Sequence, residues 1–342
     1  MSEGMITVPE KDLKKLVIDR LVEAGMSQND ALVVADVLVF ADLRGVKSHG
    51  VLRVEHYTNR IQSGGMNLKA KPAVRKLKAG IGIVDAQGGA GHPAMKLATA
   101  AAIDIARDQG MAIVGVKNNS HCGALAYYVQ QALDAKMAAL VCVNTDSAVV
   151  PTGGKFAFLG TNPFAFGYPA RRESILLDMA TSEVAFGKIF YAQERNVPIP
   201  DTWAVDAEGN KCTDPNKAKA LHPFGGAKGY GINVMVEALT GLLIGGVFGP
   251  HVKKMYAGLD TYRDLASFVL VIDPRSFWSS EEYLDIAQAM IDELHAQAAG
   301  PGSQGVLIPG EIETNNVKRS LAEGISIPKS VHDFLTTPRS KE

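Results

Sequence analysis

One region of the sequence constrains the fold most, because short apolar runs alternate there with longer amphipathic ones. "GIGIVDAQG" (80–88), "MAIVGVK" (111–117) and "MAALVCVN" (137–144) have the length and apolar character of buried strands. "HPAMKLATAAAIDIARDQG" (92–110) and "GALAYYVQQALDAK" (123–136) have the length and pattern of helices. This alternation predicts an α/β fold, in which helices pack on the faces of a parallel or mixed sheet.

The same alternation continues later in the chain. Two more buried strands are predicted, over 173–181 and 267–273, and three more helices, over 182–196, 226–243 and 279–297. The segment "NVPIPDTWAVDAEGNKCTDPNKA" (196–218) is rich in Pro, Asp and Asn and predicts a long loop. Loops of this length are usually functional or mobile.

Both ends of the chain are predicted to be helical. Thr7 and Glu10 have the spacing of a capping box at the start of a first helix, which stops at Gly25. A second helix is expected from Ser27 to near Gly45. The other terminal helices are expected over residues 49–62, 313–324 and 328–335.

The composition is that of an ordinary globular protein, with 46% hydrophobic and 21% charged residues. The net charge of -1 and the absence of a long Lys/Arg run argue against a nucleic-acid partner. Cys122, Cys142 and Cys212 are far apart, so neither a disulfide scaffold nor a Cys-based zinc site is expected. The eight histidines include no H-x-H or H-x-x-x-H pair, so no metal is expected.

No membrane segment or secretory signal is expected. The stretch "MSEGMITVPEKDLKKL" has no apolar core, and the longest apolar run, "VMVEALTGLLIGGVFG", is short and is interrupted by Glu237. The sequence therefore predicts a cytoplasmic protein.

"GAGHPA" (89–94) matches the G-x-G-x-x-A pattern of a dinucleotide-binding turn and lies between a strand and a helix. Two observations argue against that role. Pro93 removes an N–H group where a pyrophosphate needs donors. The next strand ends in Lys117 and Asn118, whereas a ribose-binding strand ends in Asp or Glu. We therefore interpret this motif as a tight turn and do not expect a Rossmann fold.

His121 follows a predicted strand and precedes a helix, and in open α/β sheets ligands bind beyond the carboxyl ends of strands. The ordinary pKa of histidine lies near neutrality, so His121 is a candidate general acid/base. Asp146 follows the next strand and is expected to lie beside His121 and orient its ring. A purely structural role for His121 at a helix end is the alternative, and the sequence does not decide between them.

The stretch "SHGVLRVEHY" places polar side chains at helical spacing. His49, Arg53 and Tyr57 would fall within a sector of roughly 80° on one helix, next to the apolar stripe. An arginine at such a place can hold a carboxylate through two N–H···O bonds, and Tyr57 and Ser48 can add directional hydrogen bonds. The alternative is an ordinary amphipathic boundary with Arg53 paired to a nearby acid, and without further information the sequence slightly favours it.

Several of these stretches occur together in a known order. "VKSHGVLRVEHY", "NNSHCGALAYY", "LGTNPFAFGYP", "LLDMATS", "GAKGYGINVM" and "IPGE" resemble, across nearly the whole chain, the type-2 malate/L-lactate dehydrogenase family. The resemblance implies the mixed-sheet α/β fold of L-sulfolactate and type-2 malate dehydrogenases, and a homodimer. It implies a helical segment 1–75 packed with a helical tail 313–342, and an α/β cofactor-binding and catalytic domain 76–312.

The resemblance also implies an NAD site without a G-x-G-x-x-G motif, and NADP is not excluded. The implied cofactor contacts are Thr145, Asp178, Met179, Ala180, Lys228, Gly310, Glu311 and Ile312. Glycines around Lys228 let the backbone approach a phosphate, and the lysine supplies positive charge. Glu311 can accept hydrogen bonds from a ribose diol.

The expected reaction is the oxidation of a small 2-hydroxy acid. A closer likeness carried by "RNVPIPDTWAVDAEGNKCTDP" and "FGPHVKKMY" favours (S)-ureidoglycolate, oxidised to oxalurate during allantoin degradation. Arg53 would hold the carboxylate, with Ser48 and Tyr57 beside it, and His121 would take the hydroxyl proton. His49 is the rival acid/base. The alternatives are L-malate, L-lactate, a sugar acid or a cyclic imino acid as substrate, or a metabolite-binding protein without catalysis.

Overall fold

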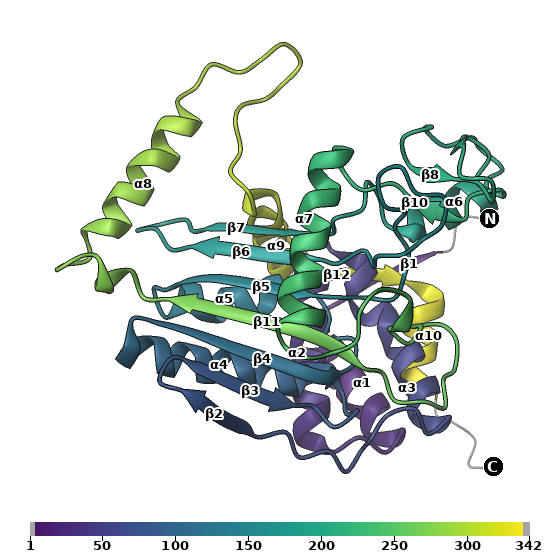
Figure 1. Cartoon of the computed structure of the whole chain (residues 1–342), viewed down its shortest axis with the longest axis horizontal. Coiled ribbons are helices and arrows are strands. Elements are labelled where there is room, and N and C mark those ends of the chain that lie inside the picture. Colours follow the sequence, from purple (N-terminus) through teal and green to yellow (C-terminus); the bar gives the residue numbers. More distant parts are fainter. Residues whose placement is uncertain (1–3, 338–342) are drawn as a thin grey trace.

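A seven-stranded mixed sheet forms the centre of the computed structural model, which describes residues 4–337 (Figure 1). The strand order is β2-β3-β4-β11-β5-β6-β7. The strands are β2 (Val74–Lys78), β3 (Ile81–Asp85), β4 (Met111–Asn119), β5 (Ala138–Val143), β6 (Phe164–Tyr168), β7 (Ile175–Met179) and β11 (Leu265–Ile272). The predicted α/β class and the mixed sheet are confirmed.

The strand directions decide where a site can form. β3 is parallel to β4, β11 is antiparallel to both β4 and β5, and β6 is antiparallel to both β5 and β7. β3, β4, β5 and β7 therefore run the same way, and their carboxyl ends lie along one edge of the sheet.

Helices cover both faces of this sheet. α4 (Gly91–Gln109) and α5 (Ala126–Asp134) lie on one face, and α7 (Ala227–Glu237) lies on the other (Figure 1). Alternate residues of β11 serve the two faces: Val269 and Val271 pack in the core under α4 and α5, whereas Phe268 packs with Val236 of α7. This period of two is what a strand buried on both faces requires.

The two ends of the chain pack together. β1 (Met5–Val8) pairs antiparallel with β12 (Ile325–Pro328), and both join a second apolar core. The helices of this part are α1 (Glu10–Glu23), α2 (Gln28–Leu43), α3 (Val54–Gln62) and α10 (Lys329–Thr336). The packing of the terminal segments on each other is confirmed, while the division of the chain at residues 75 and 312 stays a prediction.

Two local predictions near the N-terminus are wrong. Thr7 lies in β1 and pairs with Ser326, so it forms no capping box; Pro9 precedes α1 without a side-chain cap. The helix expected from His49 begins only at Val54, after two short 3-10 turns that meet at Gly50. The buried Asp42 carboxylate accepts a hydrogen bond from Val51 N (2.7 Å) and would lie 2.2 Å from a Cβ at position 50, so the chain bends around it.

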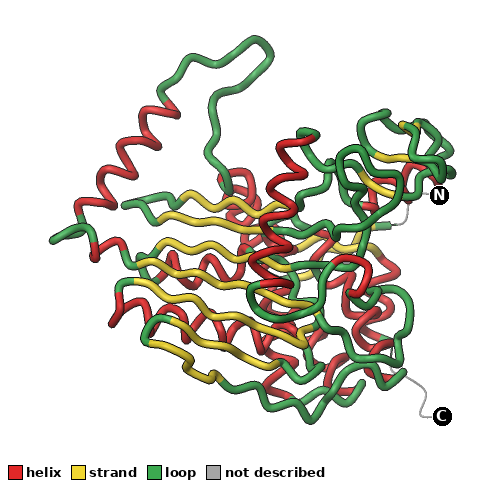
Figure 2. Tube along the Cα trace, viewed as in Figure 1, coloured by secondary structure: helices red, strands yellow, loops and turns green. Residues whose placement is uncertain are grey.

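The segment 196–218 is less irregular than predicted. It contributes β8 (Ala204–Val205) and β9 (Lys211–Cys212), and β8 pairs with both β9 and β10 (Ala220–Leu221) in a small separate sheet. With α6 (Phe186–Glu194) this sheet forms a small lobe beside the carboxyl edge of the main sheet (Figure 2). On the opposite side α8 (Glu282–His295) projects from the body, and a long loop returns to α9 (Glu311–Glu323) (Figure 2). Within residues 4–337, no helix has the length and apolarity needed to cross a membrane.

Candidate active site

The predicted catalytic residues meet at the carboxyl edge of the sheet. His121 lies directly after β4, and α3 brings Tyr57 against it. Tyr57 Oη lies 2.6 Å from His121 Nδ1 and 3.5 Å from His92 Nε2. Tyr57 and His92 are almost fully buried, so their polar contacts depend on each other and not on water. The structure thus joins the two predicted stretches that contain Tyr57 and His121.

His49 and Ser48 approach the same imidazole from the 3-10 turns. The rings of His49 and His121 are stacked with centroids 5.5 Å apart, and Ser48 Oγ lies 2.9 Å from His49 Nδ1. Arg53 Nε donates to the Ser48 carbonyl at 2.7 Å, which fixes the guanidinium beside this group. The bend at Gly50 therefore keeps these residues together, although they do not share one helix.

The local electrostatics favour neutral imidazoles. Withdrawal from water, together with the nearby His49 and Arg53, holds the pKa of His121 well below the ordinary 6.5. Burial and then the Arg53 charge lower the pKa of His49 to about 4, and burial lowers that of His92 to about 3. At neutral pH His121 is therefore able to accept a proton, as a general base must.

The predicted partnership of Asp146 with His121 is wrong. Asp146 Oδ1 accepts a hydrogen bond from Arg263 at 2.6 Å, and its Oδ2 accepts one from Met255 N at 3.3 Å. Its carboxylate therefore holds the segment after His251 and not the imidazole. Tyr57 is the side chain bonded to His121 Nδ1.

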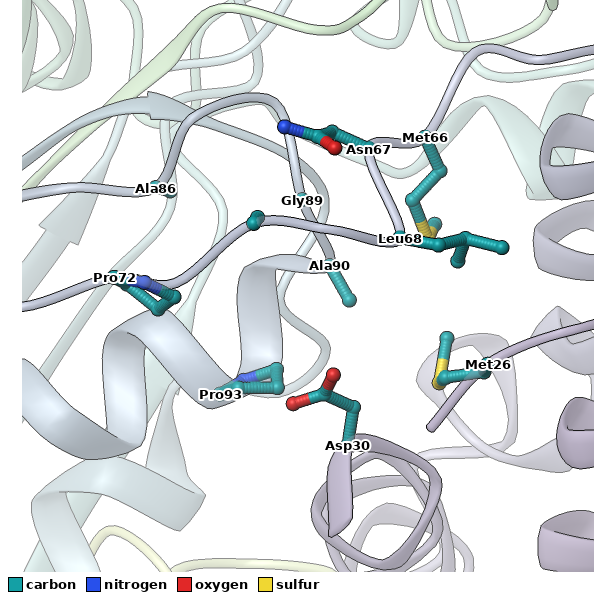
Figure 3. A pocket seen from close by; sticks show the side chains of 11 residues that line it. Met26, Asp30, Met66, Asn67, Leu68, Pro72, Ala86, Gly89, Ala90 and Pro93 are labelled. Atoms are coloured by element: carbon teal, nitrogen blue, oxygen red, sulfur yellow. The ribbon is translucent and has the colours of Figure 1, made fainter. Parts of the chain in front are cut away.

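The "GAGHPA" turn packs closely against the segment that carries His121. A Cβ at Gly91 would lie 2.3 Å from the Ser120 carbonyl oxygen, so only glycine lets α4 start directly against the His121 segment. His92, in the first turn of α4, is thereby placed on Tyr57. The small cavity beside the turn is lined by Met26, Met66, Pro93 and neighbours and contains none of the predicted site residues (Figure 3).

Three residues of the site are not predicted from the sequence. They are His92, His56 and Tyr256. His92 was visible within the turn motif, but only the fold shows that it faces Tyr57. Tyr256 Oη accepts a hydrogen bond from Arg53 Nη1, although Tyr256 lies about 200 positions away along the chain.

The residues predicted to hold the cofactor lie along the same edge, on the side of β5 to β7. Thr145 follows β5, and its Oγ1 accepts from Thr161 N at 2.9 Å. The Asp178 carboxylate accepts from Ala126 N (2.8 Å) at the start of α5, and Met179 and Ala180 end and follow β7. Thr181 continues this line through its bond to the Thr161 carbonyl at 2.8 Å.

Residues 310–312 join this group at the start of α9. The Pro309 carbonyl accepts from Leu176 N at 2.9 Å, and Gly310 has φ 93 with a Cβ position only 2.6 Å from the Leu176 carbonyl oxygen. Ile312 is exposed, whereas the Glu311 carboxylate is engaged by His295 Nε2 (2.8 Å) and Ile308 N (3.1 Å). A ribose diol at Glu311 would therefore bind beside His295.

The start of α7 has the features of an anion site. Gly225 and Gly226 have φ values of 56 and 65, which favour glycine, and a Cβ at either position would meet open space. Gly226 precedes α7 without a side-chain cap, and Ala227 next to it is exposed, so the start of the helix is open to a ligand. Lys228 is exposed in that turn. These residues fit a phosphate group of a dinucleotide.

A buried polar network holds the "GTNP" loop (160–163) against α7. Asn162 Nδ2 donates to Asn233 Oδ1 (2.7 Å) and Glu237 Oε2 (2.6 Å), and Asn233 Nδ2 donates to the Gly160 carbonyl (3.0 Å). The network ties the "GTNP" loop to α7, so the loop and the α7 start keep a fixed relation.

Comparison with known proteins gives a consistent assignment. A family model described as malate/L-lactate dehydrogenase matches residues 8–336. The chain is 39% identical over 329 residues to a ureidoglycolate dehydrogenase (NAD(+)) of Escherichia coli O157:H7, covering 96% of this chain and 94% of that protein. It is 31% identical over 328 residues to a (2R)-3-sulfolactate dehydrogenase (NADP(+)) of Chromohalobacter salexigens, covering 95% and 96%. The solved sulfolactate dehydrogenase from Methanocaldococcus jannaschii aligns with a TM-score of 0.90 at 34% identity, covering 96% and 95%.

Proposed function

The chain belongs to the malate/L-lactate dehydrogenase family, and from this premise we propose that it oxidises a small 2-hydroxy acid with NAD. The proposed substrate is (S)-ureidoglycolate and the product oxalurate. The observation that carries the proposal is geometric: Tyr57 Oη lies 2.6 Å from His121 Nδ1, and the Arg53 guanidinium is fixed nearby by the Ser48 carbonyl. A base next to a carboxylate-binding cation is what this oxidation requires.

The cofactor would lie along the carboxyl ends of β5 and β7. The α7 start with Lys228 fits its phosphates, and Thr145, residues 178–180 and residues 310–312 are proposed to hold the rest. When bound, NAD accepts the hydride from the substrate carbon at its nicotinamide ring.

The chain's own residues handle the proton. The substrate hydroxyl gives its proton to His121 Nε2 while the C2–H bond breaks and the carbonyl forms. For this, His121 must carry its other proton on Nδ1 and donate it to Tyr57 Oη at 2.6 Å. This shorter bond has to outweigh the Gly123 N–H group, which lies 3.3 Å from Nδ1 and favours the opposite tautomer. Tyr57 can then donate its own proton to His92 Nε2, which lies at 3.5 Å. Burial, and after it the nearby His49 and Arg53, lower the pKa of His121 and so disfavour a permanently charged ring, and the proton is released again after each turnover.

The substrate carboxylate is assigned to Arg53, with Ser48 and Tyr57 beside it. Arg53 Nε is already occupied by the Ser48 carbonyl, so the outer nitrogens of the guanidinium face the carboxylate. An ion pair of this kind contributes mainly to substrate binding and therefore to KM.

Ureidoglycolate is preferred because relatives named ureidoglycolate dehydrogenase (NAD(+)) are 39% identical to this chain along nearly its whole length. The decisive experiment is NAD reduction with (S)-ureidoglycolate, L-malate, L-lactate and (S)-sulfolactate at equal concentrations, each repeated with NADP. Preference for ureidoglycolate supports the proposal, and preference for another acid corrects the substrate. Lack of turnover with every acid favours the metabolite-binding alternative.

His49 remains the second candidate for the acid/base, because its ring stacks on His121 and Ser48 is bonded to it. We also propose, from the family resemblance, a cytoplasmic homodimer that acts in allantoin degradation. Sedimentation of the purified protein tests the dimer.

A further inference from the structure

The segment 252–264 contacts residues of the site and contains an exposed tyrosine, Tyr256. The side chain of Tyr256 is 66% exposed, yet it contacts two residues of the "SHGVLRVEHY" stretch. Arg53 Nη1 donates to Tyr256 Oη, and the rings of Tyr256 and His56 lie 5.2 Å apart in an edge arrangement. Tyr256 is thus linked to this stretch although most of its surface is open to solvent.

The backbone of this segment is clamped by a buried arginine. Arg60 on α3 is only 2% exposed, and its Nη1 and Nη2 donate to the carbonyls of Thr261 and Met255, both at 2.8 Å. Longer bonds reach the carbonyls of Gly258 (3.4 Å) and Lys254 (3.5 Å). α3 therefore holds the loop on both sides of Tyr256.

A second clamp comes from the sheet. Arg263, 3% exposed, donates to Asp146 (2.6 Å) and to the Lys253 carbonyl (2.8 Å), while Met255 N donates to the same Asp146 carboxylate (3.3 Å). Burying an arginine is costly, and here the outer guanidinium nitrogens of both Arg60 and Arg263 bond to the backbone of one loop. A loop fixed in this way holds Tyr256 in a defined position.

We propose that Tyr256 is a substrate-positioning residue, which together with Arg53 forms the carboxylate clamp of this site. The inference rests on the proposed function and deepens it. Tyr256 Oη accepts from Arg53 Nη1, so its own proton is free to donate to a carboxylate oxygen. Within residues 4–337, Arg53 Nη2 has no hydrogen-bond acceptor, and it supplies the second donor for the same carboxylate.

The contact also fixes the arginine itself. Ser48 holds Nε and Tyr256 holds Nη1, so the guanidinium has one orientation before substrate arrives. Preorganisation of this kind lowers the free energy that binding must spend on ordering a long side chain. Tyr256 thus acts on ground-state binding and leaves proton and hydride transfer to other groups.

The test compares Tyr256→Phe with Tyr262→Phe, a matched change at another exposed tyrosine of the same segment. Steady-state NADH formation is measured at saturating NAD with the best 2-hydroxy acid found for the wild type. Tyr256→Phe is expected to raise KM for the acid about 10-fold, since one hydrogen bond to a charged group is lost. kcat should stay within about threefold. Tyr262→Phe should match the wild type in both constants.

A double-mutant cycle tests whether Tyr256 works with Arg53. In an Arg53→Met background the Tyr256→Phe change should raise KM less than about twofold further, because the clamp is already lost. Thermal unfolding of all variants checks that the fold is intact. A Tyr256→Phe enzyme that equals Tyr262→Phe, or that loses kcat with KM unchanged, overturns the inference while leaving the proposed function standing. A wild type that oxidises no 2-hydroxy acid overturns the proposed function itself.

Discussion

Replacement of Tyr57 by phenylalanine separates two roles that this residue can have. The Tyr57 hydroxyl lies 2.6 Å from His121 Nδ1, and Tyr57 is almost fully buried. The hydroxyl therefore contacts the proposed base and not solvent. If it orients His121, its loss should appear in kcat. If it binds substrate, its loss should appear in KM.

The expected fall in kcat depends on which hydrogen-bond partner remains at His121 Nδ1 in the Tyr57→Phe variant. Without the hydroxyl, the nearest partner is the Gly123 N–H group at 3.3 Å, which donates to Nδ1 and so favours the tautomer with its proton on Nε2. That tautomer cannot accept the substrate proton. A lost buried hydrogen bond is worth about 1–1.5 kcal/mol. At about 1.4 kcal/mol per factor of ten, kcat should fall about 10-fold.

The assay is NADH formation under saturating NAD, with kcat and KM for the 2-hydroxy acid determined separately. Tyr283→Phe serves as the control, because Tyr283 is also buried and its hydroxyl donates to the Lys136 carbonyl (3.1 Å) near the start of β5, at the opposite end of the sheet from the site. This variant should lose a similar amount of stability without losing kcat. An unchanged kcat in Tyr57→Phe with a raised KM would refute the orienting role.

Three further predictions follow from the same geometry. His121→Ala should lower kcat by about 10²–10⁴, more than His49→Ala does, and the reverse order in steady-state assays would make His49 the base. Because the pKa of His121 is lowered and the base must be unprotonated, kcat/KM for oxidation should stay level near neutrality and decline with falling pH only below 6.5; a decline centred above 6.5 would contradict this. Lys228→Ala should raise KM for NAD about 10-fold with KM for the acid unchanged, whereas an effect on the acid alone would place Lys228 outside the cofactor site.

Local patterns in the sequence predict much of this fold. The strands β3, β4 and β5 and the helices α4 and α5 are marked by apolar runs between glycines and polar residues, and the structure has them where expected. Ser27 caps α2 as its sequence position suggests, with Oγ accepting from Asp30 N at 3.2 Å. These features depend on neighbours along the chain, which a single sequence displays.

What the sequence does not reveal depends on distant partners. The bend at Gly50 exists because the Asp42 carboxylate occupies the space inside it. The sequence predicts the wrong partner for Asp146 because Arg263 and Met255 reach it from a segment more than 100 positions further on. No periodicity in the sequence encodes such contacts. For the same reason, the sequence does not predict that Tyr256 contacts Arg53.

β1 and β12 pair in the fold although they are far apart in the order of synthesis. β1 is synthesised long before β12, the strand that pairs with it. The helical layer that supplies Arg53 and Tyr57 shares its apolar core with Ile325 and Ile327, so this core is incomplete until β12 has been synthesised. A chain that stops before β12 would leave Arg53 and Tyr57, which we propose to contact the substrate, on an incomplete core, so we expect activity only from molecules that contain β12.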